Sequence, residues 1–185
     1  MILITGANGQ LGQELTALCQ KRGIACRAYS RQALDICNQA RVKACFDFES
    51  FDCVINCAAY TAVDAAEDDP QTAFSVNAEG PRILAESGVP VIHVSTDYVF
   101  DGKSSLPYGT DAPVNPLSVY GRSKRAGETA LLSGGFSGLI VRTAWLYSKK
   151  ADSRNFYQTI RQLASNRNNL RVVNDQIGAP TLVND

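Results

Sequence analysis

The stretch that decides the fold reads Ile2-Leu3-Ile4-Thr5-Gly6-Ala7-Asn8-Gly9-Gln10-Leu11-Gly12. Its apolar first half is typical of a buried strand, and the amphipathic segment that continues over residues 10–22 is typical of a helix. Glycines three residues apart at such a turn permit a tight bend and a close approach to a pyrophosphate, which the free N–H groups and dipole of the helix then hold. The spacing is G-x-x-G-x-x-G rather than the more familiar G-x-G-x-x-G, and an ordinary glycine-rich turn is the alternative. Its place between a strand and a helix favours a dinucleotide site.

Short apolar runs alternate with helix-like segments along the rest of the sequence. The expected strands cover residues 24–29, 53–58, 91–95, 139–143 and 170–173, with a short apolar segment at 34–36. One further helix is expected to begin at about residue 38, and three more are expected to span about 72–86, 119–132 and 155–164. Continuously apolar strands separated by helices indicate an α/β fold: a doubly wound, Rossmann-type parallel sheet with helices on both faces. The Gly-, Pro-, Ser- and Asp-rich stretch 101–116 is expected to form a long surface loop beside the site.

The composition narrows the class of protein. Hydrophobic residues make up 45% of the 185 residues and charged residues 19%, which is typical of a globular domain and not of a disordered chain. The 18 Lys and Arg balance 18 Asp and Glu, so no net field attracts nucleic acid or a membrane surface. The apolar runs are too short for a transmembrane helix and the first residues lack a secretory pattern, so we expect a cytoplasmic protein.

The sequence gives little support for a metal or disulfide site. The six cysteines form no C-x-x-C pair, and His93 is the only histidine. A zinc site would have to consist of thiolates alone, without the paired spacing that such sites use. We therefore expect reduced, mostly buried thiols and no metal ligand set. We expect His93, in the middle of a strand, to be structural.

The residues after the second expected strand bear on the choice of cofactor. A carboxylate there binds the ribose 2′-hydroxyl of NAD, whereas a basic residue accepts the 2′-phosphate of NADP. This chain has Ser30 and Arg31 at that place, with Asp35 a few residues further on. Ser30 can donate a hydrogen bond, Arg31 can bind a phosphate, and Asp35 is expected near the adenine. The pattern favours NADPH, with NADH and a merely solvated Arg31 as alternatives.

A second group of residues suits carbonyl chemistry. Thr96 closes a strand, and Tyr120 and Lys124 share one face of an expected helix because they are four residues apart. An ammonium group beside a phenol favours the phenolate and lowers the pKa of the tyrosine. In a carbonyl reduction, Tyr120 protonates the oxygen while the hydroxyl of Thr96 hydrogen-bonds to it. This tyrosine–lysine spacing is common by chance, and the order of the motifs along the chain gives it weight.

In that order, the motifs resemble those of the extended short-chain dehydrogenase/reductase superfamily and, within it, those of the dTDP-4-dehydrorhamnose reductases. The segments that carry the resemblance span essentially the whole chain: 6–12, 58–64, 95–102, 116–124, 142–147 and 174–181. Members of this family reduce the 4-keto group of dTDP-4-dehydro-L-rhamnose with a hydride from NAD(P)H. The product is dTDP-L-rhamnose, which is used in deoxysugar and cell-surface polysaccharide biosynthesis. The resemblance therefore implies a dTDP-sugar as the substrate.

The resemblance also assigns roles to individual residues. It implies that Thr96, Tyr120 and Lys124 are catalytic, and that Asn77 supports the site through hydrogen bonds. The implied substrate contacts are Val63, Thr96, Asp97, Tyr98 and Trp145, with a plain core role as the alternative for Trp145. The implied cofactor contacts are Gly6, Asn8, Gly9, Gln10, Leu11, Gly12, Ser30, Arg31, Asp35, Ile36, Ala58, Ala59, Tyr60, Tyr120 and Lys124.

Two features depart from the family pattern. Ala65 stands where the family usually has a lysine, so a charge near the mouth of the site is missing. Family members also continue well past residues 174–181, whereas this chain stops at Asp185. We therefore expect a cofactor-binding domain over residues 1–147. Residues 148–185 are expected to hold a last helix and strand and the start of a substrate-binding lobe that is largely missing.

Other functions stay open. A nucleotide-sugar dehydratase would require Asp-Glu after Thr96, but Tyr98 follows Asp97 here, and related epimerases share the other motifs. A non-catalytic NADP-binding regulatory subunit, resembling that of methionine adenosyltransferase, would keep the fold and cofactor but bind a protein partner. A homodimer is an open alternative for the assembly. Mg²⁺, which assists some relatives, has no site that the sequence places.

Overall fold

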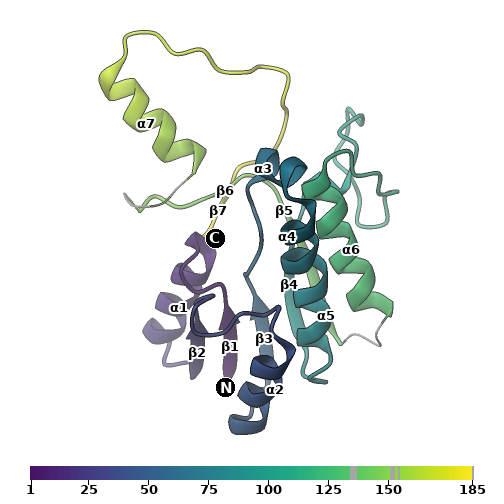
Figure 1. Cartoon of the computed structure of the whole chain (residues 1–185). Helices are drawn as coiled ribbons and strands as arrows, with labels where there is room; N and C mark the ends of the chain where they lie inside the picture. The colour runs from purple at the N-terminus through teal and green to yellow at the C-terminus, as the bar shows by residue number, and fades with distance from the viewer. Residues whose placement is uncertain (134–136, 151–152, 154, 185) are drawn as a thin grey trace.

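A five-stranded parallel sheet forms the centre of the computed structural model, which describes residues 1–133, 137–150, 153 and 155–184 (Figure 1). The strand order is β2-β1-β3-β4-β5. The bounds are β1 Ile2–Thr5, β2 Cys26–Tyr29, β3 Cys53–Asn56, β4 Val91–Thr96 and β5 Gly138–Thr143. In register, Thr5 lies between Tyr29 and Asn56, and Thr96 lies beside Thr143. The carboxyl ends of the strands therefore meet along one edge of the sheet.

Helices cover both faces of this sheet. The bounds are α1 Gln10–Lys21, α2 Gln39–Phe48, α3 Val63–Asp68, α4 Pro70–Phe74, α5 Gly80–Ala85, α6 Val119–Ser133 and α7 Phe156–Asn166. From β1 the chain moves one way to β2, and from β3 it moves the other way to β4 and β5. Because such crossovers are right-handed, α1 covers one face while α5 and α6 cover the other, where they pack on each other. The expected doubly wound, Rossmann-type fold is thereby confirmed.

The apolar core lies on the strands and on the helices that face them. Leu3, Val54 and Val91 point from β1, β3 and β4 into one cluster, where Leu84 of α5 is fully buried with them. Burial of each such side chain stabilises the fold by about 1.5–3 kcal/mol. This core fixes the reversal of strand order between β1 and β3. In doubly wound sheets, ligands bind at such a reversal, beyond the carboxyl ends of the strands.

The structure corrects several expected elements. Residues 170–173 form no strand; instead β6 Leu146–Tyr147 pairs in parallel with β7 Thr181–Leu182. Val172 and Val173 are largely exposed there, so their β-branched side chains lack the neighbours that a strand needs. The segment 34–36 is not a strand either, although Leu34 and Ile36 are buried in the core.

The helical segment expected over 72–86 is interrupted. It begins earlier, with α4 at Pro70, and a π-helical turn, Ser75–Glu79, separates α4 from α5. Two other elements were not predicted from the sequence: α3, which precedes α4, and a 3₁₀ turn over Asp97–Val99. Among the described residues, no helix is long and apolar enough to cross a membrane.

Candidate active site

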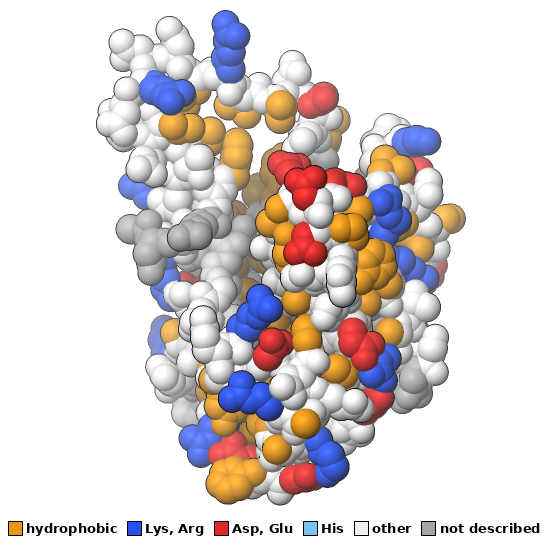
Figure 2. Space-filling model, in the orientation of Figure 1, with side chains coloured by type: hydrophobic (Ala, Val, Ile, Leu, Met, Phe, Trp, Pro, Cys, Tyr) orange, Lys and Arg blue, Asp and Glu red, His pale blue; other side chains and the backbone are white. Residues whose placement is uncertain are grey.

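One large cavity lies beyond the carboxyl ends of the strands. Its volume is about 1660 Å³. The glycine turn, the ends of β3 and β4 and the start of α6 form one wall, and residues from β6 to α7 form the other. Figure 2 shows this hollow beside α7, with hydrophobic side chains around it. A cavity of this size can hold a dinucleotide together with a second ligand.

The cavity brings together nearly all the residues that the sequence singles out. Of the predicted catalytic, cofactor and substrate residues, only Ser30 does not line it. The carbonyl of Ser30 accepts hydrogen bonds from the N–H groups of Ala33 and Leu34, so this residue shapes the bend after β2. Sequence reasoning missed a set of lining residues on and before α7, which include Lys149, Asn155, Phe156, Tyr157 and Arg161. The helical periodicity of residues 155–164 was visible, but nothing in it indicated which face would meet the cavity.

The glycine turn has the close packing that its spacing predicts. Gly6 has φ +66°, and a Cβ atom at Gly12 would lie 2.4 Å from the carbonyl oxygen of Gly6. The residue before α1 is Gly9, which supplies no side-chain cap. The first N–H groups of a helix have no intrahelical partner, so those of α1 are free for an anion at this wall of the cavity. The turn therefore fits a pyrophosphate.

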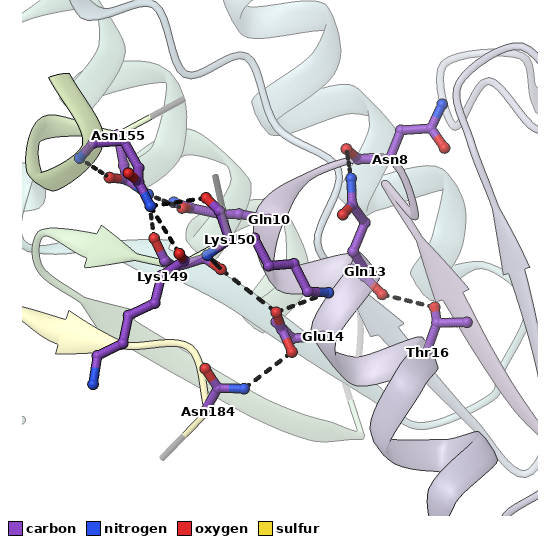
Figure 3. A network of polar contacts seen from close by, with 12 residues as sticks. Asn8, Gln10, Gln13, Glu14, Thr16, Lys149, Lys150, Asn155 and Asn184 are labelled. Atoms are coloured by element: carbon purple, nitrogen blue, oxygen red, sulfur yellow. Dashed lines mark hydrogen bonds and ion pairs between the residues drawn. The ribbon is translucent and has the colours of Figure 1, made fainter. Parts of the chain in front are cut away.

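Polar contacts fasten the opposite wall to α1 (Figure 3). Gln10 donates from Nε2 to the carbonyl of Leu146 and accepts from Asn155 Nδ2 at 3.2 Å. Glu14 pairs with Lys150 at 2.9 Å and accepts from Asn184 at 3.0 Å. The Lys150 contact holds the pKa of Glu14 below its usual value although burial opposes this. The side chain of Gln10, expected at the cofactor, thus binds chain segments that follow the sheet.

The cofactor-selecting residues lie at the open edge of the cavity. Arg31 is exposed and lies 3.7 Å from Asp35. Both residues line the cavity together with Ile36. A solvent-exposed guanidinium at this place can accept a phosphate without first breaking a buried ion pair.

Thr96, Tyr98 and Tyr120 meet at the centre of the cavity. Tyr120 is buried, and its ring packs edge-on against Tyr98 with 5.5 Å between the ring centroids. Thr96 donates from Oγ1 to Asp97 at 3.1 Å and accepts from the N–H of Tyr98. Burial raises the pKa of Asp97, although its hydrogen bonds with Thr96 and the backbone oppose the shift. These contacts fix the end of β4 where it faces the phenol.

The pKa of Tyr120 departs from the prediction. Burial raises it, and the side chain of Thr96 only partly offsets this. Lys124 is fully buried one turn along α6 and also lines the cavity, but its Nζ donates to the carbonyl of Val94 at 2.7 Å. The expected lowering by the Lys124 ammonium is therefore wrong for this state, since the amine is directed to β4 and its own charge is disfavoured by burial. That burial lowers the pKa of Lys124 to about 8.

A buried row of polar groups leads from β1 to Lys124. Thr5 Oγ1 lies 2.6 Å from Asn56 Oδ1, Asn56 Nδ2 lies 3.0 Å from His93 Nδ1, and His93 Nε2 lies 3.5 Å from Lys124 Nζ. All four side chains are essentially inaccessible to solvent. His93, expected to be structural, thus also contacts a predicted catalytic residue.

Asn77 supports the site as predicted. It lies in the π-helical turn, and its amide accepts from the N–H of Tyr60 at 2.8 Å and donates to the carbonyl of Tyr60 at 3.0 Å. It also donates to Ser123 Oγ at 2.9 Å, and that hydroxyl donates to the carbonyl of Tyr120. One buried amide therefore connects the loop after β3 to the helix that carries the phenol. Single π-helical turns are frequent at functional sites.

A buried carboxylate holds the start of the 101–116 loop. Burial disfavours the charge of Glu128, but hydrogen bonds from Arg142, Ser95 and Arg125 keep its pKa below the usual value. The guanidinium of Arg142 lies over the ring of Phe100, 5.2 Å from its centroid. Phe100 stacks on Tyr108 with 4.2 Å between the ring centroids, so the loop is anchored to Arg142 of β5.

Trp145 occupies a strained position where β5 gives way to β6. Its φ is +47°, in the left-handed region that non-glycine residues rarely adopt. Its side chain is 44% exposed, lies against Gly178 and lines the cavity. The alternative of a plain core aromatic is therefore wrong. Such strain tends to persist at ligand sites.

One of the six cysteines lies in the wall of the cavity. All six are free thiols. Cys57 lines the cavity, but burial raises its pKa to about 12 against the effect of Lys124, so it stays a thiol. No three His, Cys, Asp or Glu side chains within the described ranges lie together as metal ligands. Mg²⁺ therefore gains no site.

The fold and the cavity define a protein of the Rossmann class in which a glycine turn and a Thr, Tyr and Lys group line one cavity. All residues from 1 to 185 match the family model described as the RmlD substrate binding domain. The chain belongs to this family.

Individual relatives agree with this assignment. The dTDP-4-dehydrorhamnose reductase of Streptomyces griseus is 46% identical over 99% of this chain and 61% of its own length. The crystal structure of the dTDP-4-dehydrorhamnose reductase from Clostridium acetobutylicum is 41% identical, with a TM-score of 0.93 over 99% of this chain and 66% of that one. The Bacillus anthracis enzyme, solved in complex with NADP, is 38% identical with a TM-score of 0.93, covering 98% of this chain and 66% of that one.

This chain spans only part of its relatives. It covers 61% of the S. griseus protein and 62% of the Sinorhizobium fredii dTDP-4-dehydrorhamnose reductase. The activity of the whole protein therefore needs an argument of its own.

Proposed function

We propose that the chain is the cofactor-binding and catalytic part of a dTDP-4-dehydrorhamnose reductase, which reduces the 4-keto group of dTDP-4-dehydro-L-rhamnose to dTDP-L-rhamnose with NADPH. The observation that carries this proposal is that Thr96, Tyr120 and Lys124 line the same cavity as the glycine turn. The relatives that bear this name support the choice of reaction, and the NADP bound to the B. anthracis enzyme supports the choice of cofactor.

The residues present fit the cofactor. The N–H groups at the start of α1 hold the pyrophosphate, and the exposed Arg31 accepts the 2′-phosphate. Ala58, Ala59 and Tyr60 line the cavity between these groups and the phenol. When bound, NADPH supplies the hydride that the carbonyl carbon accepts.

The chain itself supplies the proton. Because burial raises the pKa of Tyr120, its phenol is fully protonated before the reaction and serves as the acid toward the carbonyl oxygen. The single hydroxyl proton of Thr96, which is donated to Asp97 in this structure, turns to the same oxygen when the substrate binds and places it against the phenol. One N–H of the Lys124 ammonium donates to the carbonyl of Val94. The other N–H groups are available to the phenolate that forms on Tyr120 and to a ribose hydroxyl of the cofactor.

The two parts of the chain contribute unequally to the two ligands. Residues 1–147 bind the cofactor and supply contacts to the sugar, and residues 148–185 begin the part that completes the site for the sugar nucleotide. Val63, Asp97, Tyr98 and Trp145 contact the sugar, because they line the cavity around the phenol. The indole of Trp145 offers a flat apolar face on which a sugar ring can stack.

The test is an assay of NADPH oxidation with dTDP-4-dehydro-L-rhamnose, run on this chain and on a chain extended to the length of its relatives. We expect turnover in the extended chain, and Tyr120→Phe should lower kcat about 10²- to 10⁴-fold while NADPH affinity stays unchanged. Tyr29→Phe is the matched control, because this ring packs against the core and not in the cavity. Full activity in Tyr120→Phe, or no turnover in an extended chain that binds NADPH, would contradict the proposal.

A further inference from the structure

The buried row that ends at Lys124 has a defined direction. Asn56 Oδ1 accepts two hydrogen bonds, from Thr5 Oγ1 at 2.6 Å and from the backbone N–H of Ala58 at 3.2 Å. A backbone N–H can only donate, so the atom that faces Ala58 is the amide oxygen. The amide nitrogen of Asn56 therefore faces His93.

This direction fixes the tautomer of His93. Asn56 Nδ2 donates to His93 Nδ1 at 3.0 Å, so Nδ1 must carry the lone pair. Burial keeps the pKa of His93 well below its usual value, and the charge of Lys124 adds to this, so the ring is neutral. A neutral ring with a lone pair on Nδ1 carries its proton on Nε2. That N–H points at Lys124 Nζ, 3.5 Å away.

The contact between His93 and Lys124 distinguishes the two charge states of the lysine. An ammonium group has only donors, so it meets the Nε2–H of His93 as a second donor. A neutral amine has a lone pair that can accept from Nε2–H while one of its own N–H groups still donates to the carbonyl of Val94 at 2.7 Å. The row of hydrogen bonds is complete only when Lys124 is neutral.

The other titratable groups around Lys124 act in different ways. Glu128, on the same helix, favours the ammonium, but it is itself neutralised by Arg142 and Arg125. Cys57, from the end of β3, remains a thiol. Among these titratable side chains, His93 on β4 is the one whose ring nitrogen lies within hydrogen-bond distance of Nζ, and its Nε2–H opposes the charge of the amine.

We propose that His93 is a positioning residue for Lys124: its Nε2–H orients the amino group toward the end of β4 and weakens the hold of that group on its proton. Asn56 and Thr5 act through His93, because they fix which ring nitrogen carries the hydrogen. In the reaction, and here the inference rests on the proposed function, the phenolate that forms on Tyr120 accepts a hydrogen bond from Lys124 and favours its ammonium form over the neutral amine. Lys124 then releases a proton readily as Tyr120 is restored.

The first test needs no variant and no substrate. Because His93 is the only histidine, a long-range ¹⁵N–¹H spectrum of the uniformly labelled chain contains one imidazole. We expect a neutral ring with the proton on Nε2 and no titration of the ring between pH 6 and 9. A ring protonated on Nδ1, or a charged ring, would overturn the proposal whether or not the chain is a reductase.

The second test follows Lys124 through the same ring. As pH rises through the pKa of Lys124, near 8, the Nε2–H resonance should shift because it gains an acceptor. The shift should vanish in Lys124→Met and persist in Lys43→Met, whose lysine lies on the exposed face of α2. A shift that persists in Lys124→Met, or one that is absent from the unsubstituted chain, would contradict the proposal.

The third test separates positioning from a structural role. In the extended chain, His93→Phe should move the basic limb of the kcat/KM profile to higher pH, and His93→Gln, which keeps an acceptor and a donor, should restore much of the original profile. A loss of stability in His93→Phe with an unmoved basic limb would show that the ring is structural only.

Discussion

The two walls of the cavity are held in opposite ways. The wall made of the glycine turn, β3, β4 and α6 rests on a continuous apolar core in which Leu3, Val54 and Leu84 are completely buried. The wall from β6 to α7 rests on hydrogen bonds and one ion pair to α1. None of the residues Phe156–Asn166, all of which the structure describes, is buried.

This contrast shows where the geometry of the proposed site comes from. The groups proposed to bind NADPH and to protonate the substrate belong to the apolar wall, so their geometry comes from the fold itself. The opposite wall exposes the ring of Phe156, which is 66% accessible, and in the segment after α7 the side chain of Ile177 is 99% accessible. Exposed apolar residues of this kind are suited to contact with further protein. The relatives are longer than this chain, and the proposed function assigns part of that additional length to the sugar-nucleotide lobe.

The largest difference between the walls should appear in stability. Leu84→Ala should lower the free energy of unfolding by about 2–5 kcal/mol, because it leaves a cavity in the core. Phe156→Ala should change it by less than about 0.5 kcal/mol, because the ring is mostly exposed. Urea denaturation followed by far-UV circular dichroism measures both. Equal losses in the two variants would mean that α7 belongs to the same core.

A smaller effect should separate the glycine turn from other turns. Gly12→Ala places a Cβ 2.4 Å from the carbonyl oxygen of Gly6, so the turn must shift, and we expect NADPH binding to weaken by about 1–3 kcal/mol. Gly109→Ala is the control, because a Cβ there meets no atom within 4 Å. Isothermal titration calorimetry gives both affinities. Unchanged binding in Gly12→Ala would place the pyrophosphate away from the turn.

The smallest effect concerns the polar attachment of the second wall. The contact with Lys150 lowers the pKa of Glu14 in the folded chain. The ion pair therefore contributes to the stability of the fold above about pH 4.5, and this contribution is lost as pH falls through the folded pKa of Glu14. Glu14→Gln removes it at neutral pH and should cost about 0–1 kcal/mol, because the pair is near the surface.

Hydrogen exchange should locate that loss. The amides of α7 and β6 should exchange faster in Glu14→Gln, while those of β1 and β3 should not change. Asp47→Asn, which removes the exposed ion pair with Lys43, is the matched control and should leave α7 and β6 unaffected. Uniformly faster exchange throughout the sheet would mean that the two walls unfold together.

The sequence predicts the first wall well for a physical reason. Its strands are continuously apolar, its glycines stand directly between a strand and a helix, and Tyr120 and Lys124 are placed by helical spacing alone. The cavity therefore gathers the predicted residues with the exception of Ser30. The supporting role of Asn77 was also predicted. The π-helical turn that carries Asn77 was not, because it accompanies hydrogen bonds to Tyr60 and Ser123, which are distant in sequence.

The second wall could not be predicted in the same way. The β-branched Val172 and Val173 read as a strand, but pairing is decided by the neighbour that a segment finds, and β6 pairs with Thr181–Leu182. The direction of the Lys124 side chain could not be predicted either, because it depends on burial and on the carbonyl of Val94, which is distant in sequence. Burial of Tyr120, which raises the pKa of its phenol, was not predictable from the helical spacing either.

The most direct test of the central claim is a fluorescence titration of this chain with NADPH. Trp145 is the only tryptophan, and it lines the cavity, so its emission reports the site without a label. The account predicts saturable quenching at one NADPH per chain. A chain that is folded by circular dichroism but shows no saturable change would contradict a cofactor site made by this chain alone.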